Sequence, residues 1–198
     1  MGRIEVTQGD ITKLKVDAIV NAANTTLRGG GGVDGAIHRA AGPGLDVACA
    51  KFGGCPTGEA RITPGFNLPA TFIIHTPGPV WQGGHHHEAS LLANSYRNSL
   101  QLAVANGCRT VAFPSISTGV YAYPLDQAAP LAIATIQHFL GNNSQLDRVT
   151  MVCFDARTYA AYQRALEQNN PKKRAPEKTW FSPGPSLCIR MLGRLGPP

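Results

Sequence analysis

Several features that would assign a function directly are missing from this 198-residue sequence. No run approaches the roughly 20 apolar residues that a membrane-spanning helix needs. There is no Gly-Lys-Ser/Thr ending to hold triphosphate and Mg²⁺, and no Gly-x-Ser-x-Gly elbow to present a nucleophilic serine. These absences argue against a membrane protein, a P-loop NTPase and an elbow-type serine hydrolase.

Cysteine is scarce and shows no metal-type pairing. Of the five cysteines, Cys49 and Cys55 lie closest together, and their separation fits no common zinc spacing. The chain begins with strand-like alternation and has no apolar signal-peptide region. We therefore expect reduced thiols, no structural metal and a cytoplasmic protein.

The positive charge is unevenly distributed. The whole chain carries a net charge of +6, but from Pro171 onward six basic residues oppose only Glu177, so +5 belongs to the end of the chain. The remainder is almost neutral, which weakens any prediction of a basic groove on the folded part. We expect a domain over 1–168 and a basic, proline-rich extension over 169–198 that is disordered or loosely docked.

Apolar periodicity predicts strands alternating with helices as far as Gln168. Strands are expected over 4–7, 16–21, 59–63, 71–75, 110–113 and 148–154, and helices over 33–41, 45–52, 88–106, 125–140 and 155–168. This alternation indicates an α/β domain with a mostly parallel sheet covered on both faces. In such sheets the ligand lies beyond the carboxyl ends of the strands, where segments 21–24, 114–123 and 154–155 and the loop at His75 would converge.

The loop Gly29–Gly32 is the most informative single feature. Four consecutive glycines stabilise neither a helix nor a strand, but they let bare backbone N–H groups approach a ligand just before a predicted helix. Such a loop suits a diphosphate, because N–H groups and the helix dipole converge there. Asp34 is an unexpected anion in this setting. It either caps the helix or has a chemical role.

Four linked motifs resemble one family when taken in order. They are Gly9-Asp10-Ile11-Thr12, then residues 16–24 (VDAIVNAAN), then the glycine loop with Val33-Asp34-Gly35-Ala36-Ile37-His38, then residues 114–121 (PSISTGVY). Together they resemble the macrodomain family, and within it the MacroD-type branch of bacterial O-acetyl-ADP-ribose deacetylases. The resemblance runs from about Arg3 to Gln168, and the extension has no counterpart in it.

This resemblance implies a three-layer α/β/α fold, with a mixed and mostly parallel sheet, that binds ADP-ribose in a cleft. It implies that Asp10 accepts from the adenine amino group, that Asn24 orients the distal ribose, and that Asp34 is the catalytic carboxylate. Phe154 and Asp155 fall on the adenine side. The implied substrate contacts are Asp10, Ile11, Asn24, Gly31, Gly32, Val33, Asp34, Ser117, Thr118, Gly119, Val120, Tyr121, Tyr123 and Phe154.

The implied reaction is hydrolysis of O-acetyl-ADP-ribose to ADP-ribose and acetate, with Asp34 activating water and with neither metal nor cofactor. Removal of mono-ADP-ribose from Asp or Glu esters uses the same bond type and stays open. A non-catalytic ADP-ribose reader is the alternative from another class. Expected partners are ADP-ribose derivatives and ADP-ribosylated proteins; RNA association through the basic extension is a further candidate, and no membrane is expected.

Structural explanations compete at several of these positions. Asn24 suits an Asx-turn after a strand, and Asp10 suits the start of a helical turn. Tyr123 fits packing beneath a lid as well as ligand stacking. His38 is expected to be a packed structural histidine, and His85-His86-His87 a solvated loop rather than a metal tract.

Two departures from the family pattern also stand out. Ala122 occupies a position where the family usually has glycine, and its methyl group would clash if the backbone there needs a positive φ. The connection between Cys49 and Cys55 looks shorter than in close relatives, which we expect to trim a distal surface loop.

Overall fold

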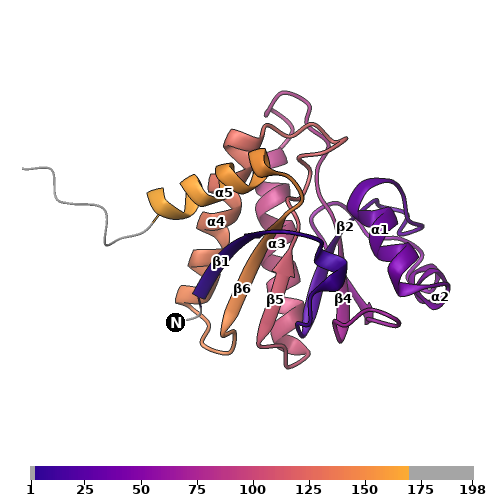
Figure 1. The fold of residues 1–198 in the computed structure, drawn as a ribbon. Helices are drawn as coiled ribbons and strands as arrows, with labels where there is room; N and C mark the ends of the chain where they lie inside the picture. The colour runs from indigo at the N-terminus through magenta and orange to yellow at the C-terminus, as the bar shows by residue number, and fades with distance from the viewer. Residues whose placement is uncertain (1–2, 170–198) are drawn as a thin grey trace, which may run out of the picture.

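A six-stranded sheet forms the centre of the computed structural model, which describes residues 3–169 (Figure 1). The strands are β1 (Arg3–Gln8), β2 (Ala18–Ala23), β3 (Arg61–Pro64), β4 (Phe72–Pro77), β5 (Thr110–Phe113) and β6 (Arg148–Cys153). Their order across the sheet is β1-β6-β5-β2-β4-β3. All neighbours pair in parallel except β3, which runs antiparallel to β4 at the edge. The expected mixed, mostly parallel sheet is confirmed.

Helices cover both faces of this sheet. They are the 3-10 turn η1 (Ile11–Lys13) and the α-helices α1 (Gly32–Ala41), α2 (Gly44–Ala50), α3 (Glu88–Ala105), α4 (Leu125–Gly141) and α5 (Ala156–Gln168). Because strand side chains alternate, β2 sends Ile19 into a core with α1 and α2, and Ala18 and Val20 into a larger core with α3, α4 and α5. The three-layer prediction is therefore confirmed.

Strands β2 and β4 each lie slightly later in the chain than predicted. The prediction placed Val16 and Asp17 in a strand, but β2 begins at Ala18. Asp17 instead joins two chain segments: its carboxylate accepts hydrogen bonds from the backbone N–H groups of Arg109 and Thr110 at 2.8 and 2.9 Å. This pairing aligns the starts of β2 and β5.

The junction between β2 and β5 is the shortest in the sheet. They pair at only two positions, Ala18 with Val111 and Ile19 with Ala112, whereas β2 and β4 pair at six. Beyond Ile19 and Ala112 the two strands have no further register, so their carboxyl ends separate. A gap at this point of a parallel sheet is where ligands bind in open α/β folds.

Most of the predicted extension, 169–198, lies outside the described residues, and so does Cys188. Its first residue, Asn169, forms the C-terminal cap of α5. The other four cysteines are buried and free. Among residues 3–169, no helix has the length and apolar character required to cross a membrane.

Candidate active site

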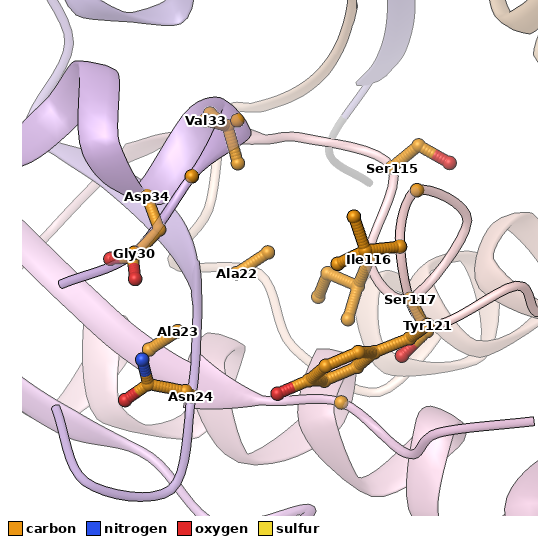
Figure 2. Close-up of a pocket in the computed structure, with 15 residues that line it drawn as sticks. Ala22, Ala23, Asn24, Gly30, Val33, Asp34, Ser115, Ile116, Ser117 and Tyr121 are labelled. Atoms are coloured by element: carbon orange, nitrogen blue, oxygen red, sulfur yellow. The ribbon is translucent and has the colours of Figure 1, made fainter.

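Two adjoining pockets, of about 380 and 470 Å³, open at the carboxyl ends of the strands. They share Gly32, Val33, Ser115 and Gly119, so they form one continuous cleft. The first pocket is lined by the predicted residues Asn24, Gly31, Gly32, Val33, Asp34, Ser117, Gly119, Val120 and Tyr121 (Figure 2). The second is lined by the predicted residues Asp10, Ile11, Gly32, Val33, Thr118, Gly119 and Phe154.

Tyr123 is the one predicted contact that lines neither pocket. Its ring is buried, with its centroid 4.7 Å from that of Trp81. The backbone N–H of Trp81 donates to the backbone carbonyl of Tyr121 at 2.9 Å, which connects this pair of rings to the cleft wall. Tyr123 therefore has the lid-packing role that the sequence left open, while Tyr121 extends across the pocket with its hydroxyl oxygen toward Asn24 (Figure 2).

Backbone rather than basic side chains dominates the middle of the cleft. Helix α1 begins after Gly31, which has no side chain to cap it, so N–H groups of the first turn point outward from the helix start. Arg39 is the only Lys or Arg among the described residues that line the two pockets. A Cβ at Gly35 would overlap the carbonyl oxygen of Gly30, so glycine is needed there for the loop to lie against the helix. The result is an anion site built of N–H groups and a helix dipole.

Asp34 lies in the first turn of α1 and is buried. Its Oδ1 accepts a hydrogen bond from Asn21 Nδ2 at 2.8 Å and lies 3.4 Å from His38 Nε2. A Cβ built on Gly30 would lie 3.2 Å from Asp34 Oδ2, so the second oxygen adjoins the pocket-lining glycine loop. Burial raises the pKa of Asp34, although the Asn21 donor and His38 oppose this shift. The side chain is engaged with Asn21 rather than capping its helix.

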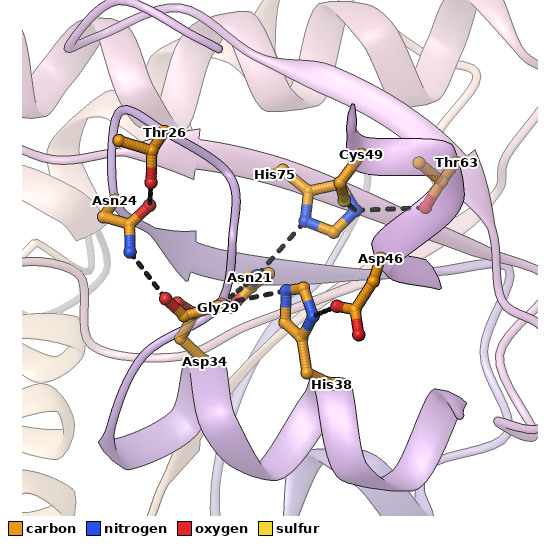
Figure 3. Close-up of polar contacts among 10 residues, drawn as sticks. All are labelled: Asn21, Asn24, Thr26, Gly29, Asp34, His38, Asp46, Cys49, Thr63 and His75. Carbon is orange, nitrogen blue, oxygen red and sulfur yellow. Dashed lines mark hydrogen bonds and ion pairs between the residues drawn. The ribbon is translucent and has the colours of Figure 1, made fainter. Parts of the chain in front are cut away.

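Asn24 follows β2 and holds the glycine loop in place. Its Nδ2 donates to the Gly29 carbonyl at 2.8 Å, and its Oδ1 accepts from the Thr26 hydroxyl at 2.7 Å (Figure 3). A Cβ on Gly30 would lie 3.6 Å from Asn24 Nδ2 as well as close to the Asp34 carboxylate. An amide and a carboxylate thus flank the same loop residue at one end of the cleft.

The other end of the cleft is lined by a carboxylate and an exposed ring. Asp10 Oδ1 accepts from the backbone N–H and the hydroxyl of Thr12, at 2.9 and 2.7 Å, so Asp10 does cap η1. These bonds lower the pKa of Asp10 and keep it ionised at neutral pH. Within residues 3–169 its Oδ2 has no hydrogen-bond partner. Phe154 is 87% exposed beside it, an unusual position for a phenylalanine that no ligand covers.

The loop after β5 is held in an uncommon backbone conformation. Ser117 and Ala122 have φ values of +66° and +56°, in the left-handed region that favours glycine. The predicted departure at Ala122 therefore falls where a positive φ is needed, and the loop accommodates it with strain. Gly78, the residue after β4, lets this loop lie close to the β4 end, because a Cβ on Gly78 would overlap Ser117 Oγ and Ile116.

Three polar residues lie beneath Asp34; the sequence placed Asn21 and His75 at this edge of the sheet without assigning them a role, and it missed Thr63. Asn21 in β2 and His75 in β4 are fully buried and lie opposite each other in the strand register. Asn21 Nδ2 lies 3.1 Å from His75 Nδ1, and Thr63 Oγ1 lies 3.0 Å from His75 Nε2 (Figure 3). The available signal was a polar residue inside the apolar strands β2 and β4, Asn21 in the first and His75 in the second. Such a residue needs a partner once it is buried.

His38 contacts more of the site than its predicted packing role implied. Its Nδ1 bonds Asp46 at 2.7 Å while its Nε2 faces Asp34. His38, Cys49 and His75 also place ligand-type atoms within 4.8 Å of one another. Both ring nitrogens of each histidine already have polar neighbours, and burial raises the pKa of the Cys49 thiol to about 11. We therefore interpret the cluster as a hydrogen-bonded support for Asp34.

The histidine tract before α3 is exposed, as predicted. Its loop is fixed by Glu88, whose carboxylate accepts hydrogen bonds from three backbone N–H groups, those of Gln82, Gly84 and His86. This arrangement explains how a glycine- and histidine-rich loop keeps a defined course without metal-type geometry among its histidines.

Comparisons with known proteins agree on one family. The family profile described as Macro domain matches residues 20–132. A Macro domain-containing protein of Lactiplantibacillus plantarum is 64% identical over 84% of this chain and 97% of its own length. An O-acetyl-ADP-ribose deacetylase of Klebsiella pneumoniae is 58% identical over 82% of this chain and 95% of its own length. The Oceanobacillus iheyensis macrodomain solved with ADP is 48% identical, with a TM-score of 0.81 over 84% of this chain and 91% of that one. The same macrodomain has also been solved as variants, one of them with ADPR.

Proposed function

The chain belongs to the Macro domain family, and on that premise we propose that it binds ADP-ribose and hydrolyses O-acetyl-ADP-ribose to ADP-ribose and acetate. One observation carries the proposal. The buried Asp34, whose pKa is raised, lies at the end of a cleft whose centre offers backbone N–H groups to an anion. This combination places a base beside a diphosphate site without requiring a basic side chain to neutralise it.

The proposed ligand spans both pockets. The adenine lies by Phe154, with its amino group donating to Asp10 and a ring nitrogen near the Ile11 N–H. The diphosphate lies between the start of α1 and the loop 117–121, and the distal ribose reaches Asn24 and Asp34. The free Oδ2 of Asp10 supports the adenine end, because an ionised carboxylate selects an amine donor over a carbonyl.

A solved relative supports the distal end. The Oceanobacillus macrodomain variants replace an asparagine and an aspartate that lie ten positions apart, the same separation as Asn24 and Asp34 here. The variant solved with ADPR replaces a glycine three positions before that aspartate, as Gly31 precedes Asp34. We infer that these are the matching positions in this chain.

In the proposed mechanism, Asp34 Oδ2 accepts a proton from a water molecule as the water oxygen attacks the acetyl carbonyl. Backbone N–H groups of the glycine loop stabilise the oxyanion that forms. Collapse of the tetrahedral intermediate breaks the bond between the acyl carbon and the ribose oxygen. The proton held by Asp34 passes to that ribose oxygen, which regenerates the carboxylate and leaves ADP-ribose and acetic acid, which ionises in solution. Asn24 positions the ribose hydroxyl groups.

Removal of mono-ADP-ribose from Asp or Glu esters is the second candidate, because the cleaved bond is again an acyl ester of the distal ribose. The half-exposed position of Asn24 favours this second candidate, since a protein-linked acyl group must approach from solvent at that end of the cleft. A non-catalytic reader has no need for a buried carboxylate next to a bound diphosphate, so Asp34 argues against it.

The experiment measures acetate release from O-acetyl-ADP-ribose and ADP-ribose release from a protein modified on acidic residues. Wild type is compared with Asp34→Asn and Asn24→Ala, and ADP-ribose affinity is measured by calorimetry for each. We expect Asp34→Asn to keep binding while its kcat falls by about 10² to 10⁴, the usual contribution of a general base. Binding without any product from the wild type refutes the hydrolase and favours the reader. Full activity in Asp34→Asn refutes the mechanism alone.

A further inference from the structure

The polar residues beneath Asp34 form a directional chain. It runs from Thr63 in β3, through His75 in β4 and Asn21 in β2, to Asp34 at the start of α1 (Figure 3). Asn21 and His75 are fully buried, and Thr63 is nearly so. Buried polar groups in strands otherwise rich in apolar residues lower the stability of a core unless hydrogen bonds satisfy them.

The Asp34 carboxylate sets the direction of the hydrogens in this chain, which leaves Asn21 Oδ1 buried and without a hydrogen-bond partner among residues 3–169. The Asp34 carboxylate can only accept, so Asn21 must turn its Nδ2 toward Asp34 Oδ1, 2.8 Å away. The same nitrogen faces His75 Nδ1 at 3.1 Å, so Nδ1 must be the unprotonated acceptor. The ring hydrogen then lies on Nε2, which points at Thr63 Oγ1 at 3.0 Å. Burial lowers the pKa of His75 to about 3, which agrees with a neutral ring.

From this chain we propose that His75 and Thr63 are positioning residues for the hydrolysis: the ring holds the Asn21 amide that donates to Asp34 Oδ1, and Thr63 Oγ1 accepts the Nε2 hydrogen of the tautomer that this requires. The proposal rests on the proposed function, in which Asp34 is the base. With Oδ1 held from below, Oδ2 is turned toward the glycine loop, where Gly30 lies. None of Thr63, His75 and Asn21 lines either pocket.

Other titratable groups around Asp34 and His75 come from α1 and α2. His38 Nε2 faces Asp34 Oδ1 at 3.4 Å, and Asp46 bonds the far side of His38. Cys49 Sγ lies 3.8 Å from His75 Nε2 and is a weaker acceptor than Thr63 Oγ1. These groups are held constant in the experiment, because the substituted residue, Thr63, is uncharged and contacts neither His38 nor Asp46 through any hydrogen bond.

Thr63→Val tests the proposal, and Thr63→Ser is its matched control. Valine keeps the shape but removes the oxygen acceptor for the Nε2 hydrogen, so the tautomer that Asn21 requires loses a hydrogen bond that stabilises it. When Nδ1 carries the hydrogen, Asn21 must turn its oxygen to the ring, and Asp34 loses its donor. We expect kcat of Thr63→Val to fall at least tenfold with KM within twofold of wild type. The acid limb of its kcat profile should move to higher pH, because Asn21 donation lowers the Asp34 pKa. Thr63→Ser should match wild type in kcat, in KM and in the position of the acid limb.

A spectroscopic measurement separates this proposal from the proposed function. In ¹⁵N-histidine-labelled wild type, we expect the His75 signals of an imidazole protonated on Nε2 alone, and a mixture of tautomers in Thr63→Val. Thermal unfolding confirms that the variants are folded. A wild-type ring protonated on Nδ1, or a Thr63→Val variant with unchanged kcat and pH profile, overturns the positioning role. If wild type releases no product, the proposed function fails, and the NMR signal still decides whether the tautomer is fixed.

Discussion

His75 should make the stability of this protein depend on pH in a way that one substitution removes. Its imidazole is fully buried between β2, β3 and α2, and burial lowers its pKa from 6.5 to about 3. The unfolded chain takes up a proton below pH 6.5, whereas the folded chain does not until about pH 3. The unfolded state therefore binds more protons in this window, and stability falls as the pH is lowered from 7 toward 3.

The expected size follows from the two pKa values. Each pH unit below 6.5 costs about 1.4 kcal/mol from this group, and the accumulated loss at pH 5 is about 2 kcal/mol. That is a substantial part of the ~5–15 kcal/mol by which domains are usually stable. His75→Gln removes the titrating ring. We expect this variant to be less stable than wild type at pH 7.5 but to lose about 2 kcal/mol less than wild type between pH 7.5 and 5.

The assay is urea unfolding at half-unit steps between pH 7.5 and 5, with the free energy of unfolding extrapolated at each step. His86→Gln is the control, because it is the same substitution at an exposed histidine in the loop before α3, away from the buried cluster around His75. Parallel losses of stability in wild type and His75→Gln would refute the reasoning. They would mean that the folded protein admits a charged imidazole at this position.

Three further substitutions, one of them with a matched control, test the loops and the sheet. Ala122→Gly should stabilise the protein by about 0.5 to 1 kcal/mol, or about 2 °C in Tm, because the relief of strain at a positive φ exceeds the entropy cost of glycine. The control is Ala134→Gly, at an exposed position in α4. This substitution should destabilise the protein by about 1 kcal/mol. Gly78→Ala should weaken ADP-ribose binding at least tenfold by calorimetry, because the added methyl group displaces Ser117 and its loop. Asp17→Ala should lower the free energy of unfolding by about 2 kcal/mol in urea, since two strand-end N–H groups lose their acceptor. Burial raises the pKa of Asp17, but the hydrogen bonds from Arg109 and Thr110 outweigh it and leave the pKa below its usual value of 3.8. The stability that Asp17 contributes is therefore present above pH 3.8 and is lost as the pH falls further.

Each of these has an outcome that contradicts it. A lower Tm for Ala122→Gly would show that the loop gains more from the methyl group than it loses in strain. Unchanged affinity in Gly78→Ala would separate the loop from ligand binding. An Asp17→Ala variant as stable as wild type near pH 7 would mean that water replaces the carboxylate at the strand ends.

Local sequence signals predicted the order and extent of the elements closely. The helix expected over 33–41 is α1 at Gly32–Ala41, because glycines precede it and Gly42 ends it. Strand β5 lies at Thr110–Phe113 as predicted, since an apolar run follows Asn106-Gly107. These features depend on neighbours along the chain, which a single sequence contains.

The site was predictable only in part, because its chemistry depends on contacts between distant segments. The resemblance placed Asp34 and Asn24, and the structure brings both to the cleft. The hydrogen bond between Asn21 and Asp34, and the pairing of Asn21 with His75 across β2 and β4, depend on strand register. Tyr123 lies in a motif beside cleft residues, yet its side chain is buried against Trp81.

The short junction between β2 and β5 has a mechanical consequence. In the strand pairing itself, only two residue pairs join the half-sheet β1-β6-β5 to the half-sheet β2-β4-β3. Segments from both halves line the cleft, because Asn24 and Gly78 follow strands of the second half and Phe154 and the loop 115–121 follow strands of the first. A ligand that fills the cleft therefore contacts both halves of the sheet at the point where β2 and β5 are not paired, and its binding should hold the two halves together.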